Sequence, residues 1–502
     1  MQRRVDVPWW VEWVAKLAVG PWQASAVPKG LGPGGTRAGL GFLEVFRIFG
    51  AQPSTMRSIL ILGAGRSASA LIRYLIQHAP EQSWRITVAD KDPSHAAMLV
   101  AEGPAVATGF ALDATDGAAR AALIAKHDLV ISMLPAFMHM DVLKDCLALK
   151  KHVITPSYVP DALWSMDTEF KAAGLTVLNE MGLDPGIDHM SAMRILDRIR
   201  AEGGRMEAFE SYCGGLVAPE SDDNPWGYKF SWNPRNVILA GQGGAAKYIR
   251  DGETKYIPYH KLFRQTVRVA VEGFGEFDGY ANRDSLKYRS HYGLDEIPTL
   301  MRGTLRKAGF CAAWDSFVQL GCTEDGFPME LDAKADWSAF IDAFLPHCQE
   351  CGTRGNLANY LGLDPDGEEM QKLDWLGLFE RHNPIGVSGR SPAATLQHLL
   401  EQKWKLGPSD KDMVVMWHRF RYAIEGQHQT IHASLGVIGE DTVQTAMART
   451  VGLPIAMATK LLLNGTITDR GVLLPLRSVI YEPILDELEE HGIRFVEEEV
   501  EA

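Results

Sequence analysis

The chain has 502 residues, of which 46% are apolar and 23% charged, and its formal net charge is −13 at pH 7. This length predicts about two to four domains, and the composition is typical of a globular protein and excludes a disordered or collagen-like chain. No run of about 18 uncharged apolar residues occurs, so we expect no membrane span. The acidic chain has no concentrated basic patch, so we expect no nucleic-acid partner.

The first 55 residues differ from the rest of the chain. They hold four tryptophans between residues 9 and 22 and a Gly/Pro-rich stretch at 28–41, with no persistent helix or strand period. Charged residues interrupt the apolar stretch that a secretory signal needs. We expect residues 1–55 to be a loosely ordered extension, with Met56 a possible natural start because a strand pattern follows it directly. The alternative is a helix whose tryptophan face lies on a membrane surface.

Cysteine usage argues against a metal centre. Six cysteines are scattered along the chain, and only Cys348 and Cys351 form a Cys-x-x-Cys pair. A structural zinc site usually needs two such pairs, so we expect no metal site. We expect these two thiols to be reduced and the protein to be cytoplasmic.

Residues 58–90 follow the order of a dinucleotide-binding unit. An apolar run at 58–62 is followed by Gly63-Ala-Gly-Arg-Ser-Ala68, a helical pattern ending near Pro80, and a second strand pattern at 85–89. In such a unit the first glycine permits a tight turn, the second lets the backbone approach a pyrophosphate, and the helix N-terminus supplies free N–H groups. We therefore predict that this loop binds a nicotinamide dinucleotide through Gly63, Gly65, Arg66, Ser67 and Ala68.

Further strand patterns alternate with helical ones at 107–113, 129–132, 152–155 and 175–178. Together with the first two strands they predict a doubly wound parallel sheet over 56–180. Ligands of such sheets bind at the carboxyl ends of the strands. That rule places Asp113 with its neighbour Ala114, Ser132 and Ser157 near the cofactor.

The residue at the end of the second strand bears on the choice of cofactor. Asp90 lies where an acid is expected to bind the ribose 2′-hydroxyl, and a carboxylate there repels a 2′-phosphate. Asp90 therefore favours NAD. The adjacent Lys91 is able to pair with a phosphate, so NADP stays open.

The second half of the chain carries several motifs rich in glycine and charged residues. They are Gly-Leu-Asp-Pro-Gly-Ile-Asp-His at 182–189, Ser-Tyr-Cys-Gly-Gly at 211–215, Gly-Tyr-Lys-Phe-Ser-Trp at 227–232, Asn-Arg-Asp-Ser at 282–285 and Arg-Gly-Thr-Leu-Arg at 302–306. Arginines flanked by glycines suit the binding of a small carboxylate ligand. From Met56 to the end, these motifs in this order resemble the L-glutamate-forming saccharopine dehydrogenases, also called saccharopine reductases.

The resemblance implies a domain organisation. We expect a Rossmann domain at 56–180 and a second α/β domain with a mixed sheet at 181–334 and 426–441, which binds substrate and forms a homodimer. A mostly helical insertion is expected at 335–425, and residues 442–502 are expected to return to the Rossmann domain.

The resemblance also implies a reaction: NAD(P)-dependent oxidation of saccharopine to L-glutamate and L-2-aminoadipate 6-semialdehyde, or its reverse, in lysine synthesis or degradation. By similarity, the residues that contact substrate are Ser157, Tyr158, Arg283, Thr304, Leu305 and Arg306. Asp184 is expected at the junction of cofactor and substrate.

The general acid or base is left open by the sequence. Asp184, Tyr158, His189 and Cys213 are candidates, and we favour Asp184 and Tyr158. The carboxylates of Asp184 and Asp188 also suit a simpler role, the capping of a helix that starts near His189. Two other functions are considered: a carboxynorspermidine-type reductase acting on another amine, and a non-catalytic dinucleotide sensor.

Overall fold

The computed structural model describes residues 56–500. The predicted extension at 1–55 and its alternative as a membrane-surface helix fall outside this range.

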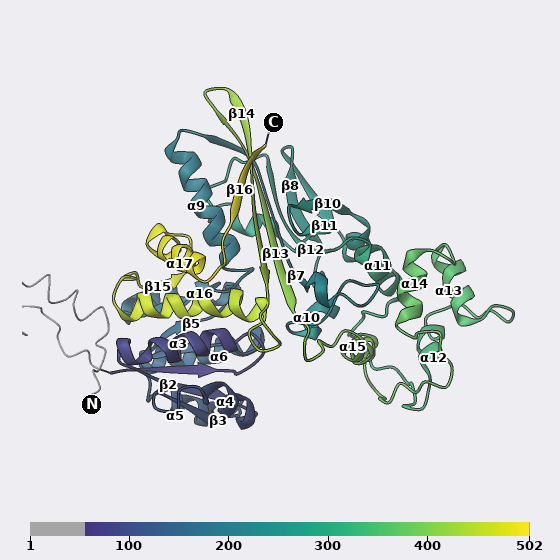
Figure 1. Ribbon diagram of the computed structural model, residues 1–502, viewed down its shortest axis with the longest axis horizontal. Helices are drawn as coiled ribbons and strands as arrows, with labels where there is room; N and C mark the ends of the chain where they lie inside the picture. Colours follow the sequence, from purple (N-terminus) through teal and green to yellow (C-terminus); the bar gives the residue numbers. More distant parts are fainter. Residues whose placement is uncertain (1–55, 501–502) are drawn as a thin grey trace, which may run out of the picture. The chain divides into compact units, whose positions relative to one another are not determined.

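The first sheet contains seven strands, all parallel, in the order β15-β6-β5-β4-β1-β2-β3 (Figure 1). Six come from the predicted Rossmann segment, and the seventh is supplied by the end of the chain. The strands are β1 (Arg57–Leu62), β2 (Trp84–Asp90), β3 (Ala107–Ala111), β4 (Leu129–Ser132), β5 (His152–Ile154), β6 (Thr176–Leu178) and β15 (Gly471–Leu473). Their side chains are mainly buried because helices cover the sheet, which explains the continuous apolar runs.

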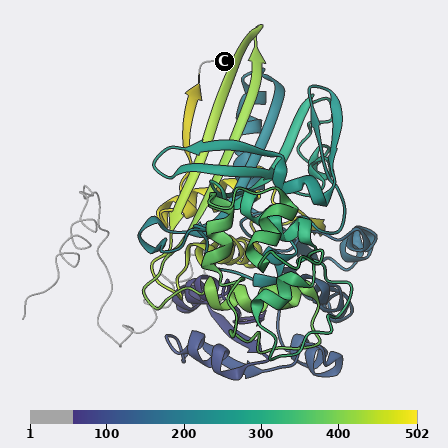
Figure 2. The ribbon, with the colours of Figure 1, turned by 90° about the vertical axis from the view of Figure 1, so that its right-hand side faces the viewer.

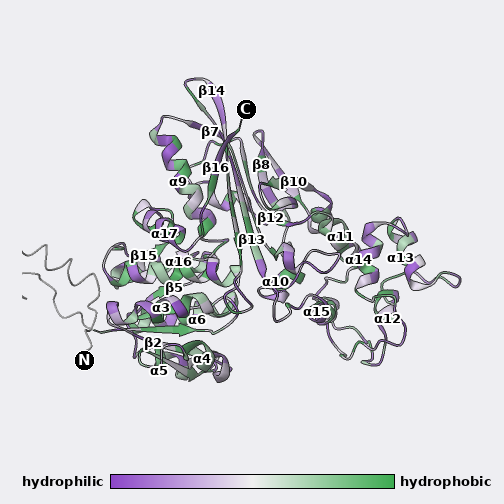
Figure 3. Ribbon diagram, in the orientation of Figure 1, coloured by the Kyte–Doolittle hydropathy of each residue, from purple (hydrophilic) through white to green (hydrophobic). Residues whose placement is uncertain are grey.

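The helices that accompany this sheet are α3 (Ser69–Gln82), α4 (Pro93–Val100), α5 (Gly117–Ile124), α6 (His139–Leu149), α7 (Asp161–Trp164), α8 (Asp167–Ala172), α16 (Ala446–Leu463) and α17 (Ser478–Glu490). Helices α3 and α16 lie side by side and carry many hydrophobic residues (Figure 3). Gly452 permits this approach, because a Cβ there would lie 2.7 Å from the backbone nitrogen of Leu71. Helix α16 has the length and composition of a membrane span, but 78% of it is buried inside the protein, as in the core helix of a globular protein.

The second sheet is mixed. Strands β12 and β7 are parallel, whereas the other pairs along the order β10-β11-β12-β7-β13-β14-β16 are antiparallel (Figure 2). Strand β8 also pairs with β12, and β9 pairs with β8. Its strands are β7 (Arg205–Val217), β8 (Ala246–Arg250), β9 (Glu253–Ile257), β10 (Thr266–Val271), β11 (Gly275–Ala281), β12 (Thr299–Lys307), β13 (Asp412–Ile424), β14 (Gln427–Ile438) and β16 (Val496–Val500). The predicted fold class, a Rossmann sheet with a second mixed-sheet α/β part, is therefore confirmed.

Helices dominate the predicted insertion, but it ends earlier than expected. The helices of the second part of the chain are α9 (Ile187–Ala201), α10 (Pro234–Ile238), α11 (Phe310–Leu320), α12 (Trp337–Asp342), α13 (Thr353–Leu361), α14 (Glu368–Trp375) and α15 (Pro392–Lys403). The end of the insertion at 425 is wrong, because residues 412–424 form β13 in the centre of the second sheet. Most side chains on both faces of β13 are buried, so its sequence lacks the alternation that reveals a strand.

The prediction that residues 442–502 return to the Rossmann domain also needs correction. Helix α16 and strand β15 do return, but the final strand β16 pairs with β14 in the second sheet. This strand is exposed and rich in glutamate, so its sequence carries no hydrophobic signal.

The expectation of reduced thiols is likewise wrong, since Cys348 and Cys351 form a disulfide.

Candidate functional site

The turn between β1 and α3 fits a dinucleotide. Gly63 has a φ of +101°, and a Cβ there would lie 3.0 Å from the carbonyl oxygen of Met133. A Cβ on Gly65 would meet nothing within 4 Å, so the space above the loop is open for a pyrophosphate. No side chain caps the first turn of α3, whose N-cap is Ala68. Its N–H groups and dipole are therefore suited to an anion.

Asp90 lies at this turn with a fixed orientation. Its Oδ2 accepts a hydrogen bond from the Ala64 N–H at 2.6 Å, and its Oδ1 accepts one from the Asp92 N–H at 2.8 Å. The neighbouring Lys91 extends its Nζ to 3.5 Å from Oδ2 of Asp113. The structure thus brings the predicted ribose acid to the glycine loop and pairs Lys91 with a second acid.

The remaining predicted cofactor residues occupy different environments. The Arg66 guanidinium donates to the carbonyl oxygen of Phe230 at 3.1 Å, which links the glycine loop to the second half of the chain. Ser67 is half-buried. Ala114 is buried, and its carbonyl accepts from Arg120 at 2.6 Å.

A histidine absent from the sequence prediction connects the ends of two strands. Nδ1 of His139 lies 2.9 Å from Oγ of Ser132, and its Nε2 lies 2.6 Å from Oγ of Ser157. Burial lowers the pKa of His139 to about 4, so the ring is neutral at pH 7. Ser132 was predicted on the cofactor side and Ser157 on the substrate side, and the imidazole joins the two.

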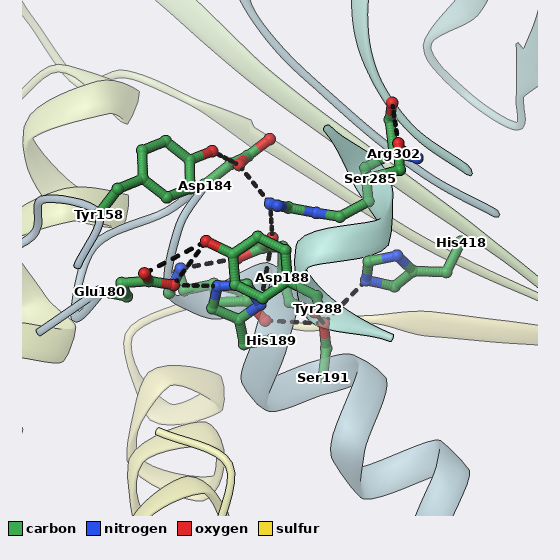
Figure 4. A network of polar contacts seen from close by, with 12 residues as sticks. Tyr158, Glu180, Asp184, Asp188, His189, Ser191, Ser285, Tyr288, Arg302 and His418 are labelled. Atoms are coloured by element: carbon green, nitrogen blue, oxygen red, sulfur yellow. Dashed lines mark hydrogen bonds and ion pairs between the residues drawn. The ribbon is translucent and has the colours of Figure 1, made fainter. Parts of the chain in front are cut away.

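The centre of the candidate site is a buried arginine that holds two carboxylates (Figure 4). Nη2 of Arg302 lies 2.8 Å from Oδ1 of Asp184 and 2.6 Å from Oδ2 of Asp188. The Tyr158 hydroxyl donates to the same Oδ1 of Asp184 at 2.8 Å, and the second oxygen of that carboxylate points away from both donors. The guanidinium carbon of Arg302 lies 4.5 Å from the ring centroid of Tyr288. Asp184 is thereby oriented with one oxygen left for another partner.

The two carboxyl groups differ in acidity. Burial raises the pKa of Asp184, and the positive charge of Arg302 opposes that rise only in part. Burial also acts on Asp188, but His189 and Arg302 together hold its pKa below the usual range. Within this pair, Asp184 is the group better suited to take up and release a proton.

A second set of buried polar groups lies next to the centre formed by Arg302 and its two carboxylates. Glu180 has a φ of 59° and directs its carboxylate to the Val159 N–H at 2.9 Å, the Tyr288 hydroxyl at 3.0 Å and Nε2 of His189 at 2.8 Å. Nδ1 of His189 lies 2.6 Å from the Tyr292 hydroxyl. His189 is fully buried and has no access to a substrate, so the structure favours a supporting role for it.

Buried histidines predict a loss of stability in mild acid. Burial lowers the pKa of His139 and of His418, whose Nε2 lies 2.8 Å from Oγ of Ser191, to about 4 from the ordinary value of 6.5. Below pH 6.5 the unfolded chain binds protons at these sites and the folded chain does not, so stability falls as pH drops to 4, by roughly 3 kcal/mol for each ring. Thermal midpoints measured between pH 7.5 and 4.5 check this. Between these pH values the thermal midpoint of the His418→Gln variant is expected to fall by less than that of the wild type. Equal falls of the midpoint in the two proteins would contradict the assignment.

The predicted substrate residues of β12 are placed on its two faces. Thr304 and Arg306 share the face of Arg302, because alternate residues of a strand point the same way. The Leu305 side chain is buried in the core of the second sheet, so Leu305 faces the site only through its carbonyl, which accepts from Nη1 of Arg306 at 2.9 Å. Arg283, with a φ of 35°, is exposed on the loop after β11.

Arg306 is a buried cation without a counterion. Its side chain is 3% exposed, its guanidinium carbon lies 5.2 Å from the Tyr228 ring centroid and 5.7 Å from that of Phe310, and its Nε has no hydrogen-bond partner. Among residues 56–500 no carboxylate pairs with it within 4 Å, whereas Arg302 has two. A buried guanidinium in this state is suited to a ligand carboxylate.

Sequence reasoning missed part of this centre. Arg302 was recognised within a motif but given no role, although its spacing of four from Arg306 on a strand places both on one face. Glu180 and Tyr288 gave no signal, because their roles depend on contacts between distant segments. Asp188 does not cap α9 from the N-cap position, which is Gly186, but its Oδ1 accepts from the Gly186 N–H at 2.6 Å.

Comparison with known proteins agrees with this geometry. The family model described as saccharopine dehydrogenase NADP binding domain matches residues 59–178, and that described as saccharopine dehydrogenase C-terminal domain matches residues 182–493. The chain belongs to the saccharopine dehydrogenase family. The predicted family is thereby confirmed, together with an NAD(P)-dependent oxidoreductase class.

Relatives of this saccharopine dehydrogenase family member align over most of its length. The saccharopine dehydrogenase [NADP(+), L-glutamate-forming] of Pyricularia oryzae is 36% identical over 88% of this chain and 99% of its own. The mitochondrial alpha-aminoadipic semialdehyde synthase of Bos taurus is 35% identical over 88% of this chain and 48% of its own. The solved apo saccharopine dehydrogenase (L-Glu forming) of Saccharomyces cerevisiae has a TM-score of 0.79 and 34% identity, covering 89% of this chain and all of that one.

Proposed function

We propose that this chain is an L-glutamate-forming saccharopine dehydrogenase. In this reaction saccharopine, NAD(P)⁺ and water give L-glutamate, L-2-aminoadipate 6-semialdehyde, NAD(P)H and a proton. Saccharopine carries three carboxylates, and the observation that carries the proposal is the buried, unpaired guanidinium of Arg306 on the same strand face as the Asp184–Arg302 pair. Its relatives of that name, matched over nearly their whole length, support the same substrate.

The nicotinamide, when bound, accepts the hydride from the lysine-side carbon next to the secondary amine of saccharopine. We assign its pyrophosphate to Gly63, Gly65, Arg66, Ser67 and Ala68, with Asp90 and Lys91 at the ribose and Asp113, Ala114 and Ser132 along the carboxyl ends of the strands. Substrate carboxylates are assigned to Arg306 and to the exposed Arg283, which a bound ligand is expected to cover. Thr304, the Leu305 carbonyl, Ser157 and Tyr158 complete the pocket.

Asp184 and Tyr158 are the residues that we assign to proton handling. Hydride leaves an amine only when its nitrogen lone pair is free, so a base must take the proton from the secondary ammonium. Oδ1 of Asp184 is occupied by Tyr158 and Arg302, which leaves Oδ2 to accept this proton. The raised pKa of this carboxyl group brings it closer to neutral pH. After this proton has passed to solvent, the same carboxylate is again free to receive a proton from the water that attacks the imine.

We further propose a preference for NAD, because the acids around the ribose site outnumber the bases. Asp90, Asp92 and Asp113 surround this end of β2 and β3, and Lys91 is turned toward Asp113. Three carboxylates against one ammonium disfavour a 2′-phosphate. The saccharopine dehydrogenases of Pyricularia oryzae and Saccharomyces cerevisiae carry NADP(+) in their names, so this chain would differ from them at this site.

The Asp90→Ser variant tests this preference. Removing the carboxylate loses a hydrogen bond to the ribose and a repulsion toward 2′-phosphate, so the ratio of kcat/KM for NAD⁺ to that for NADP⁺ should fall by about tenfold or more, or about 1.4 kcal/mol. Steady-state kinetics with both cofactors measure this ratio. A wild type that already strongly prefers NADP⁺ would contradict the assignment of Asp90.

The function itself is tested by adding saccharopine to the enzyme with either cofactor and following the absorbance of the reduced nicotinamide. We expect saccharopine-dependent reduction and the release of glutamate. Turnover of a carboxynorspermidine-type substrate instead would favour the related reductase, and dinucleotide binding without any turnover would favour a sensor.

Two further proposals concern the setting of the enzyme. We propose a homodimer formed by the second domain, as the family resemblance implies, and no nucleic-acid or membrane partner, since the net charge is −13. We propose a cytoplasmic location, because four of the six cysteines are free and buried, and the Cys348–Cys351 disulfide is the exception to this pattern.

A further inference from the structure

A cavity of about 390 Å³ opens at the end of the Rossmann sheet opposite to the site described above. Its charged and polar lining consists of Arg57, Asp128, Lys150, Lys151, His152 and Arg470. Arg57 begins β1, His152 begins β5 and Arg470 directly precedes β15, so the cavity lies at the amino ends of parallel strands. The glycine loop and Asp184 follow the carboxyl ends of such strands, so the two sites are separated by the length of the sheet.

The charge of this cavity contrasts with that of the chain. Four cationic side chains and one carboxylate line it, although the net charge of the protein is −13. Within residues 56–500, none of these four cations forms an ion pair within 4 Å. The single acid, Asp128, has its Oδ2 bound by the Ser58 N–H at 2.7 Å and the Ser58 hydroxyl at 2.8 Å. Against its burial, these hydrogen bonds and then the charges of Arg57 and Lys151 hold the pKa of Asp128 low, so it offsets part of the cationic charge. With four cations and one carboxylate, the cavity holds excess positive charge.

Two of the lining groups are fixed in position. Nδ1 of His152 accepts from the Thr176 N–H at 3.0 Å, so the ring proton is on Nε2, which is left as a donor. Nη1 of Arg470 donates to the Asp469 carbonyl at 2.9 Å and to Oγ1 of Thr176 at 3.2 Å. Burial and the positive charges of Arg470 and Arg57 lower the pKa of His152, which indicates that the arginines act on the imidazole. An anion placed here would relieve this repulsion.

Helix ends explain only part of the arrangement. Lys150 is the C-cap of α6, and Lys151 follows it, where the helix dipole favours a cation. Arg57 and Arg470 belong to the starts of strands and have no such reason to converge on the same space. Leu462 and Leu463 add an apolar wall, which suits a short carbon chain between anionic groups.

We propose that this cavity is a second binding site, for a small metabolite with two or more anionic groups. Carboxylates and phosphates share the chemistry that Arg57, Lys151 and Arg470 recognise. The site is separate from the binding of saccharopine and dinucleotide, and its ligand need not take part in the reaction.

Binding is tested by calorimetry on the full chain, with citrate and inorganic pyrophosphate as probes and sodium chloride at matched ionic strength as the reference. We expect saturable binding of at least one probe. Citrate alone would identify a carboxylate ligand, pyrophosphate alone a phosphate ligand, and both together the shared anionic chemistry. If neither citrate nor pyrophosphate binds saturably, the proposal is wrong.

Substitutions test whether the anion binds in this cavity. Lys151→Glu should weaken it at least tenfold, whereas Lys261→Glu, an equal charge change at an exposed position on the second domain, should leave it unchanged. The double variant Lys150→Gln and Lys151→Gln provides a milder change if the reversal impairs folding. Arg306→Met should not alter it, so a failed substrate assignment is distinguished from a failed second site. Equal binding by the wild type and both Lys151 variants would refute the location.

Discussion

Replacing Arg306 by methionine is expected to lower kcat/KM for saccharopine by roughly 30- to 1000-fold, or about 2–4 kcal/mol, and to leave dinucleotide binding unchanged. The guanidinium is buried and has no carboxylate partner in the protein, so its charge is available to the substrate. Methionine retains the packing against Tyr228 and Phe310 but leaves a substrate carboxylate without its partner. Steady-state kinetics and fluorescence titration with reduced dinucleotide measure the two effects.

Arg306→Lys serves as the matched control. An ammonium keeps the charge but cannot form the two parallel hydrogen bonds of a guanidinium, so only part of the activity should return. The Arg283→Ala variant, measured in the same assays, tests whether the exposed Arg283 also binds a substrate carboxylate. Unchanged saccharopine kinetics in Arg306→Met would remove this residue from the pocket, and an equal loss of dinucleotide binding would indicate misfolding.

Replacing Arg302 by methionine is expected to damage the fold as well as catalysis. The change leaves the carboxylates of Asp184 and Asp188 buried without their cation, a situation that costs roughly 3–5 kcal/mol. It also frees Asp184 from its orientation toward Tyr158, so kcat should fall. Thermal unfolding and saccharopine kinetics measure the two losses.

The pH dependence of the stability of Arg302→Met distinguishes the loss of the cation beside two buried carboxylates from a simple packing defect. Without the guanidinium, the pKa of Asp184, which burial already raises, rises further, and Asp188 loses one of the two charges that hold its pKa below the usual range. A carboxyl group whose folded-state pKa lies above the unfolded value contributes stability at low pH that is lost as pH rises, so the cost of the unpaired carboxylates grows with pH. The deficit relative to the wild type should therefore shrink below pH 5, and adding Asp188→Asn should recover part of it at pH 7. A deficit independent of pH would indicate a packing effect alone.

The Rossmann sheet was readable from sequence because its elements are local. The segment from Ser58 to Asp90 carries strand, glycine loop, helix and acid within one stretch of chain, and each part has its own signal. By contrast β13 is buried on both faces and lacks the alternation of apolar and polar residues that marks a strand, and the charged β16 resembles a surface tail. Both are strands only because distant segments pair with them.

The residues of the candidate site also form two groups: those that the sequence identified and those whose roles depend on distant partners. Asp184 and Arg306 lie in motifs, Tyr158 is assigned by the family resemblance, and the structure brings Asp184 and Tyr158 within hydrogen-bonding distance. Arg302, Glu180 and His139 each depend in part on distant partners, which lie 118 residues away for Arg302, 108 for Glu180 and 18 for His139. The sequence pattern around each of them gives no sign of such a partner.

The path of the last sixty residues has a consequence for how the protein is made. β15 completes one edge of the first sheet and β16 completes one edge of the second. Both strands emerge from the ribosome after every other strand of their sheets. Neither sheet can reach its final form until these two strands have been synthesised. The nascent chain must therefore keep two open edges from pairing with other chains, and a premature stop codon just before β15 would leave both edges exposed at once.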